Sequence, residues 1–196
     1  MPAVFMRVRS ILSISCLLML SCGPKKPAAI DVVNDAAGRE TVILAPTDGT
    51  PAMNTIHTGK TTPQQLIGFA RTAIGIPYKY ASFDPEKGFD CSGFITYVFN
   101  HFGIAVPRSS VDFTDVTHEV PLQSAQAGDL ILFTGTDSRT CVVGHMGIVV
   151  TGKGEPLQFI HSTSGRANGV TISPLNSGYM ERFVKIVRIF PQNEKK

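Results

Sequence analysis

The chain has 196 residues, of which 43% are hydrophobic and 17% charged, so its composition is that of a globular protein that can bury one sizeable core. The net charge of +3 falls to +1 when Arg7 and Arg9 of the N-terminal segment are set aside, because 16 basic residues then face 15 acidic ones. This near balance argues against nucleic acid or another polyanion as the partner.

The first 22 residues differ from the rest of the chain. Arg7 and Arg9 form a short basic start, the stretch from Ile11 to Leu20 is an apolar run, and no acidic residue precedes Asp31. This is the architecture of a secretory signal. The ten residues of this run span about 15 Å as a helix, roughly half of the ~30 Å hydrocarbon core, which argues against a permanent transmembrane helix.

The end of this segment, MLSCG, resembles the lipobox of bacterial lipoproteins, with Met19 where leucine is usual and Ser21 directly before Cys22. The resemblance implies a signal peptide over residues 1–21 and a lipid on Cys22, which would anchor the chain in the cell envelope, at the outer membrane or the periplasmic face. The alternative is an unmodified cysteine near the cleavage point. Residues 22–61 are rich in Gly, Pro, Thr and Asp and are expected to form a tether, allowing for one short strand.

From residue 62 the pattern becomes regular. Thr62 is a helix N-cap followed by Pro63, apolar residues then recur at helical spacing, and Gly75 can end the helix.

A second apolar pattern predicts a helix from about Cys91 to Phe102, with Asp90 as its N-cap. Cys91 therefore lies in the first turn, where free N–H groups and the partial positive charge of the helix favour the nucleophilic thiolate. The same N–H groups are placed to stabilise an oxyanion. The alternative for Cys91 is a small buried core residue, the commonest fate of a free cysteine.

Beyond this helix the chain reads as short strands separated by turn residues, at 128–134, 145–152, 156–163, 169–175 and 183–190. Helices first and strands later indicate an α+β fold. His145 opens one strand and His161 lies near the end of the next, so antiparallel pairing brings both imidazoles to the same end of the sheet. With Cys91, they supply the nucleophile, base and orienting group of a thiol hydrolase.

Five segments, GFDCSGFITYVF, VPRSS, AGDLILF, GHMGIVV and FIHST, occur in this order and together resemble the NlpC/P60 family of bacterial cell-wall cysteine peptidases. The resemblance implies a papain-like α+β domain over residues 62–190, with N-terminal helices packed on an antiparallel β-sheet, followed by a tail over residues 191–196. It also implies that Cys91, His145 and His161 are the catalytic residues.

The same resemblance assigns further residues to the site. Tyr78 matches the tyrosine of the family's PY block, which helps to bind substrate or oxyanion. Asp90 and Ser92 match the residues that flank the nucleophile and hold a substrate amine in some members, although Asp90 alternatively only caps the helix. Arg108 is expected to pair either with a substrate carboxylate or with an acidic neighbour.

The expected function is hydrolysis of peptidoglycan stem peptides, preferably between γ-D-glutamate and a diamino acid, by a monomeric enzyme. The alternatives are an amidase or acyltransferase that uses the same triad, and a catalytically silent wall-binding lipoprotein. No cofactor or metal is expected, because the chain lacks glycine-rich nucleotide motifs and paired CxxC motifs and offers no evident fourth ligand for zinc. Ala81 and Ser82 replace two glycines that are usual in the family, which leaves the substrate preference open.

Overall fold

The computed structural model describes residues 32–34, 40–42, 55–140 and 142–194. The chain divides into two units, Met1–Ala45 and Pro46–Lys196. In the first unit, strands β1 (Val32–Asn34) and β2 (Glu40–Val42) pair antiparallel, so this stretch holds two short strands where the sequence allowed for one. Cys22 and the predicted signal segment lie outside the described residues.

Helix α1 (Pro63–Thr72) begins where its sequence predicts. The Thr62 side chain accepts a hydrogen bond from the Gln65 N–H, and the Gln65 side chain accepts one from the Thr62 N–H, which forms a capping box. Packing of the second unit begins before the predicted boundary at residue 62, because Ile56 and Thr58 are already buried.

Helix α2 (Cys91–His101) follows a short hairpin of β3 (Phe83–Asp84) and β4 (Gly88–Phe89). The Asp90 carboxylate accepts the Gly93 N–H at 2.5 Å, which confirms the predicted N-cap. Gly93 has no room for a side chain, because a β-carbon there would collide with the carbonyl oxygen of Ser82. The start of α2 is therefore held by both its cap and the chain beside it.

Six antiparallel strands form the sheet, in the order β5-β10-β6-β7-β8-β9. Their bounds are β5 (Glu119–Val120), β6 (Leu130–Thr134), β7 (Val143–Val149), β8 (Gln158–Thr163), β9 (Gly169–Pro174) and β10 (Phe183–Val187). The remaining short helices are η1 (Ser110–Asp115), η2 (Leu122–Ser124), η3 (Ser138–Thr140), α3 (Ser177–Met180) and η4 (Pro191–Glu194). Every predicted strand is present, and β5 is an addition.

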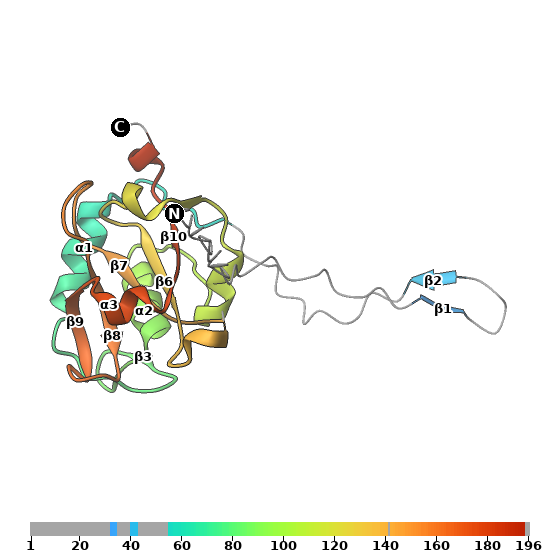
Figure 1. Ribbon diagram of the computed structural model, residues 1–196, viewed down its shortest axis with the longest axis horizontal. Coiled ribbons are helices and arrows are strands. Elements are labelled where there is room, and N and C mark those ends of the chain that lie inside the picture. Colours follow the sequence, from blue (N-terminus) through green and yellow to red (C-terminus); the bar gives the residue numbers. More distant parts are fainter. Residues whose placement is uncertain (1–31, 35–39, 43–54, 141, 195–196) are drawn as a thin grey trace, which may run out of the picture. The chain divides into compact units, whose positions relative to one another are not determined.

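The sheet is buried on both faces. Leu130 and Leu132 of β6 pack with the apolar side chains of α1 and α2, whereas the alternate residues Ile131 and Phe133 belong to a second cluster against which Tyr179 of α3 packs. Figure 1 accordingly shows α2 behind the sheet and α3 in front of it. This arrangement confirms the α+β prediction.

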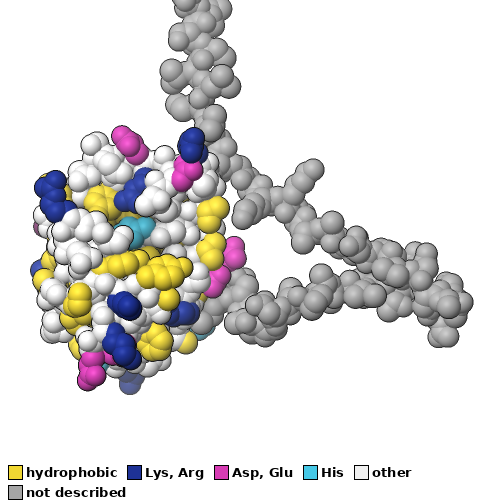
Figure 2. All heavy atoms as spheres, turned by 90° about the horizontal axis from the view of Figure 1, so that it is seen from below, with side chains coloured by type: hydrophobic (Ala, Val, Ile, Leu, Met, Phe, Trp, Pro, Cys, Tyr) yellow, Lys and Arg dark blue, Asp and Glu magenta, His cyan; other side chains and the backbone are white. Residues whose placement is uncertain are grey.

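The surface carries no block of a single charge on the face drawn in Figure 2, where basic, acidic and hydrophobic side chains are interspersed. Within the described ranges, no helix is both long and apolar enough to cross a membrane.

Candidate active site

Cys91 occupies the first turn of α2 and is 9% exposed. Its Sγ lies 3.8 Å from the carbonyl oxygen of Gly144, so the start of α2 abuts the start of β7. Burial raises the pKa of the Cys91 thiol and the neighbouring Asp90 raises it further, against a smaller opposing effect of the nearby N–H groups of Ser92, Cys91 and Met146. The N–H groups at the helix start thus favour the thiolate, as predicted, but burial has the larger effect and the pKa of the thiol is raised overall.

The two predicted histidines meet across β7 and β8. Ile148 pairs with Ile160, and the same register continued places Gly147 opposite His161 and leaves His145 diagonal to it on the same face. The Nε2 atom of His145 and the Nδ1 atom of His161 are 2.8 Å apart. Gly147 permits this approach, because a β-carbon there would lie 2.7 Å from the Phe159 ring and 3.2 Å from the β-carbon of His161.

Both imidazoles are held in the neutral form at pH 7. Burial, with a smaller effect of the Arg182 guanidinium, lowers the pKa of His145 to about 4. Burial, the neighbouring His145 and Arg182 together lower the pKa of His161 to about 3. A neutral ring with a free lone pair is the form that a general base requires.

The Cys91 thiol lies beside the residue that precedes His145, the proposed base. Gly144, whose carbonyl oxygen is the hydrogen-bond partner of Cys91, directly precedes His145 in β7. Among the described residues, no hydrogen bond connects the Cys91 thiol with the His145 ring. Catalytic hydrogen bonds are often long or misaligned in the absence of substrate.

Asp90, Ser92 and Arg108 form one connected group. The guanidinium of Arg108 donates to both oxygens of Asp90, at 3.1 and 2.7 Å, and to the Ser92 hydroxyl at 3.0 Å. Of the two partners expected for Arg108, a substrate carboxylate or an acidic neighbour, the structure shows the acidic neighbour, Asp90. The Asp90 carboxylate is thus used by the helix cap and by Arg108, and it is not a free anion.

A groove of 410 Å³ runs past the thiol. It is lined by Tyr78, Tyr80, Ala81, Asp90, Cys91, Ser92, Arg108, Ser109, Ser110 and Gly144. Of the residues predicted for catalysis and substrate binding, all except the two histidines line this groove, and Gly144, the residue before His145, lines it as well. Burial, then the nearby thiol, Asp90 and Tyr80, raise the pKa of Tyr78, so its phenol stays protonated and able to donate.

The loop that carries Ala81 is shaped by a positive φ of 58° at this residue. This is the left-handed region, where a β-carbon costs about 1 kcal/mol and glycine fits without strain. Ala81, which replaces a glycine usual in the family, therefore lies at a backbone position that favours glycine, and its methyl group forms part of the wall of the groove.

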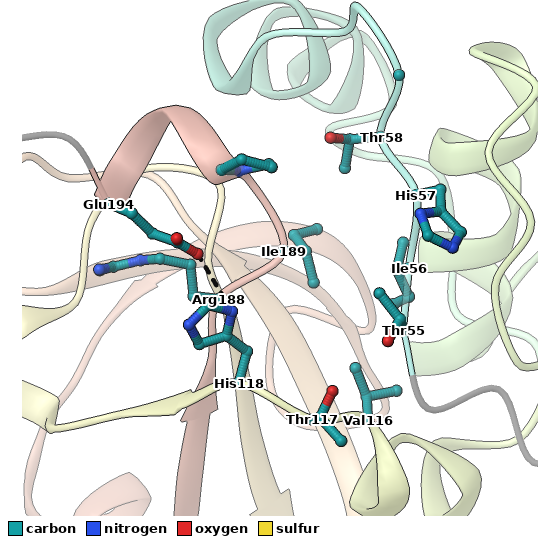
Figure 3. A pocket seen from close by; sticks show the side chains of 12 residues that line it. Thr55, Ile56, His57, Thr58, Val116, Thr117, His118, Arg188, Ile189 and Glu194 are labelled. Atoms are coloured by element: carbon teal, nitrogen blue, oxygen red, sulfur yellow. Dashed lines mark ion pairs between the residues drawn. The ribbon is translucent and has the colours of Figure 1, made fainter.

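A second hollow, of 300 Å³, lies between residues 55–59, 116–118 and the C-terminal segment (Figure 3). On one side of it His118 pairs with Glu194, with Nδ1 and Oε1 3.2 Å apart, and residues 55–58 lie on the other side. Neither the thiol nor the pair of neutral histidines lines this hollow, so the candidate site is the groove beside Cys91. Across the part of the chain that the structure describes, no three His, Cys, Asp or Glu side chains are placed to hold a metal ion.

Comparison with known proteins finds chains of similar sequence. The chain is 35% identical over 105 residues to the bifunctional muramidase/DL-endopeptidase CwlT, and 34% identical over 126 residues to a gamma-DL-glutamyl hydrolase, both of Bacillus subtilis (strain 168). The two matches cover 54% and 64% of this chain but 30% and 29% of the relatives, so the chain spans less than a third of either protein.

The fold has equally clear relatives. A crystal structure of an NlpC/P60 family protein from Bacillus cereus ATCC 10987 shares it with a TM-score of 0.59 and 32% identity, over 68% of this chain and 42% of that one. The sequence model of the NlpC/P60 family matches residues 75–189, which is more than half of the chain and includes the thiol and both histidines. The chain therefore belongs to the NlpC/P60 family.

Proposed function

We propose that the protein is a cysteine peptidase that hydrolyses peptidoglycan stem peptides, preferably between γ-D-glutamate and a diamino acid. The observation that carries the proposal is the convergence of Cys91, at the start of α2, with the neutral pair of His145, near the start of β7, and His161, in β8. The substrate class is supported by the relatives, one a gamma-DL-glutamyl hydrolase and the other a DL-endopeptidase.

The chemistry begins with proton transfer from the thiol. His161 engages Nε2 of His145, so Nδ1 is the nitrogen left to accept this proton. Because burial keeps the resting thiol protonated, Sγ attacks the scissile carbonyl carbon as its proton moves to His145. For this step the thiol must turn from the Gly144 carbonyl toward His145, and we expect substrate binding to cause that rotation.

The rest of the cycle returns the proton. His145 gives it to the departing amine, which leaves a thioester on Cys91, and a water molecule deprotonated by the same ring then hydrolyses the thioester. The N–H groups of Cys91 and Ser92, which already lie near Sγ, are the proposed oxyanion donors. The protonated hydroxyl of Tyr78 in the same groove is a third.

The charges in the groove wall determine whether the enzyme requires a free amino group on the substrate. Asp90 is neutralised by Arg108 and capped into α2, so it offers no unpaired carboxylate to a substrate ammonium group. We therefore expect stem peptides whose amino end is still acylated to be accepted as well as peptides with a free amine. The Arg108 side chain, 40% exposed in the groove wall, remains accessible to a substrate carboxylate.

Digestion of purified peptidoglycan tests the proposal. The fragments released by the wild-type chain and by Cys91→Ser are identified by mass spectrometry. Products cut between γ-D-glutamate and the diamino acid, absent with the variant, support it. Intact stem peptides freed from the sugar indicate an amidase instead, and the absence of any product indicates a wall-binding protein.

We also propose that Cys22 carries a lipid that anchors the chain in the cell envelope, at the outer membrane or the periplasmic face. The basis is the MLSCG segment after an apolar run with a basic start. A lipid anchor suits an enzyme whose substrate is an insoluble wall beside the membrane.

A further inference from the structure

His161 has polar partners on its far side that the sequence did not indicate. The ring is completely buried, and its Nε2 atom lies 3.0 Å from the hydroxyl oxygen of Ser173 and 3.4 Å from that of Tyr179. A buried imidazole N–H without an acceptor costs about 1 to 3 kcal/mol. The hydroxyl oxygens of Ser173 and Tyr179 are therefore available to accept a hydrogen bond from an N–H at Nε2 of His161.

Both hydroxyls are fixed by the fold. Ser173 lies on β9 opposite Phe159, which places it diagonal to His161 on the same face of the sheet. Tyr179 lies in α3, where its N–H donates to the Asn176 side chain at 3.1 Å. The guanidinium of Arg182 lies 5.3 Å from the centre of the Tyr179 ring.

The chain of contacts restricts the tautomers that suit the proposed reaction. If His145 is to accept a proton at Nδ1, its own proton must lie on Nε2 and be donated to His161 Nδ1. His161 then carries its proton on Nε2 and must donate it to a hydroxyl oxygen. The reverse pattern would place a proton on Nδ1 of His145 and leave no base for the thiol.

We propose that Ser173 and Tyr179 are positioning residues, which accept the Nε2–H of His161 and thereby keep His145 in the tautomer with an unprotonated Nδ1. This inference rests on the proposed function for its catalytic consequence. The arrangement itself has a separate physical readout, because the two tautomers of a neutral imidazole differ in which nitrogen bears the proton.

Nitrogen-15 NMR of the histidine rings of the full chain at pH 7 reads that difference directly, without substrate. The expected result is a proton on Nε2 in both His145 and His161. A proton on Nδ1 of His145 in the wild-type protein would overturn the proposal. This result does not depend on peptidase activity, so a failed proposal here and a failed functional assignment are distinguishable.

Shape-matched variants then test the hydroxyls. Ser173→Thr and Ser173→Val have similar shapes, but only the first retains a hydroxyl, and Tyr179→Phe removes only the phenolic oxygen. Because the Tyr179 hydroxyl can accept the Nε2–H in its place, we expect Ser173→Val to lower kcat by less than the about 10-fold that one hydrogen bond is worth, with KM unchanged and with Ser173→Thr close to wild type. Circular dichroism checks that each variant is folded.

The double variant is the sharpest case, because each hydroxyl can serve when the other is missing. We expect Ser173→Val combined with Tyr179→Phe to lose more kcat than the product of the two single losses, and to move the His145 proton toward Nδ1. A folded double variant with wild-type kcat and wild-type tautomers would show that the two hydroxyls are only packing neighbours.

Discussion

Removing the carboxylate of Asp129 should destabilise the domain more than any change at its surface. Asp129 accepts hydrogen bonds from Arg188, from Nε at 3.2 Å and from Nη2 at 3.0 Å, and from the Gln126 N–H at 2.9 Å. Nη2 of Arg188 also donates to the Ser124 carbonyl oxygen at 2.7 Å. The side chain of Asp129 is 0% exposed and that of Arg188 is 8% exposed, so Asp129→Ala leaves a buried guanidinium without its counter-charge.

The magnitude follows from that burial. Breaking a buried ion pair by removing one partner costs about 3 to 5 kcal/mol, which corresponds to a fall in Tm of about 10 to 20 °C for a domain of this size. The double variant Asp129→Ala with Arg188→Met removes both charges, and it should regain a large part of the loss, because an apolar pair often replaces a buried ion pair at little cost.

Chemical denaturation followed by circular dichroism measures these differences as changes in the free energy of unfolding. Asp137→Ala is the matched control, because Asp137 pairs with Arg139 at the surface and should leave the denaturation midpoint unchanged. An Asp129→Ala variant within about 1 kcal/mol of wild type would refute the reasoning, since a guanidinium left buried without its partner costs about 3 kcal/mol or more.

Three further predictions concern the site and the anchor. His145→Ala should abolish turnover, whereas His161→Ala should lower kcat/KM by about 10- to 1000-fold. His161→Asn and His161→Gln should lower kcat/KM by less, because an amide can still orient His145. If His145→Ala is active while a folded His161→Ala is inactive, the roles of the two histidines are reversed. Because burial lowers the pKa of His145 to about 4, kcat/KM should be lost on acidification with a midpoint near pH 4, and a midpoint at 6.5 or above would contradict this environment. Cys22→Ala should move the protein from the membrane fraction to the soluble fraction, so a wild-type chain that is already soluble in a lipoprotein-processing host would rule out the anchor.

Local patterns predicted the elements that carry the site. The apolar spacing and Asp90 located α2, and the positions of His145 and His161 in consecutive strands were enough to bring the rings together once β7 and β8 paired antiparallel. These features depend on residues close in sequence and on the two-residue period of a strand, which are readable without a structure.

Contacts between residues distant in sequence could not be predicted from such local patterns. Arg188 lies in the strand predicted over residues 183–190, yet β10 ends at Val187 and the guanidinium reaches Asp129, for which the sequence indicated no charged partner. Ser173 and Tyr179 lack the chemical signature of a cysteine or histidine, and only the sheet register and the short helix α3 bring them to His161. The raised pKa of Cys91 likewise depends on burial by segments distant in sequence.

Trapping the acyl-enzyme tests the central claim most directly. The full chain is mixed with a defined stem peptide, quenched with acid during turnover, and examined by intact-protein mass spectrometry and peptide mapping. The account predicts a thioester on Cys91 whose added mass is that of the acyl part of the substrate, with no adduct and no hydrolysis for folded Cys91→Ser. Undiminished hydrolysis by Cys91→Ser would contradict the thiol mechanism.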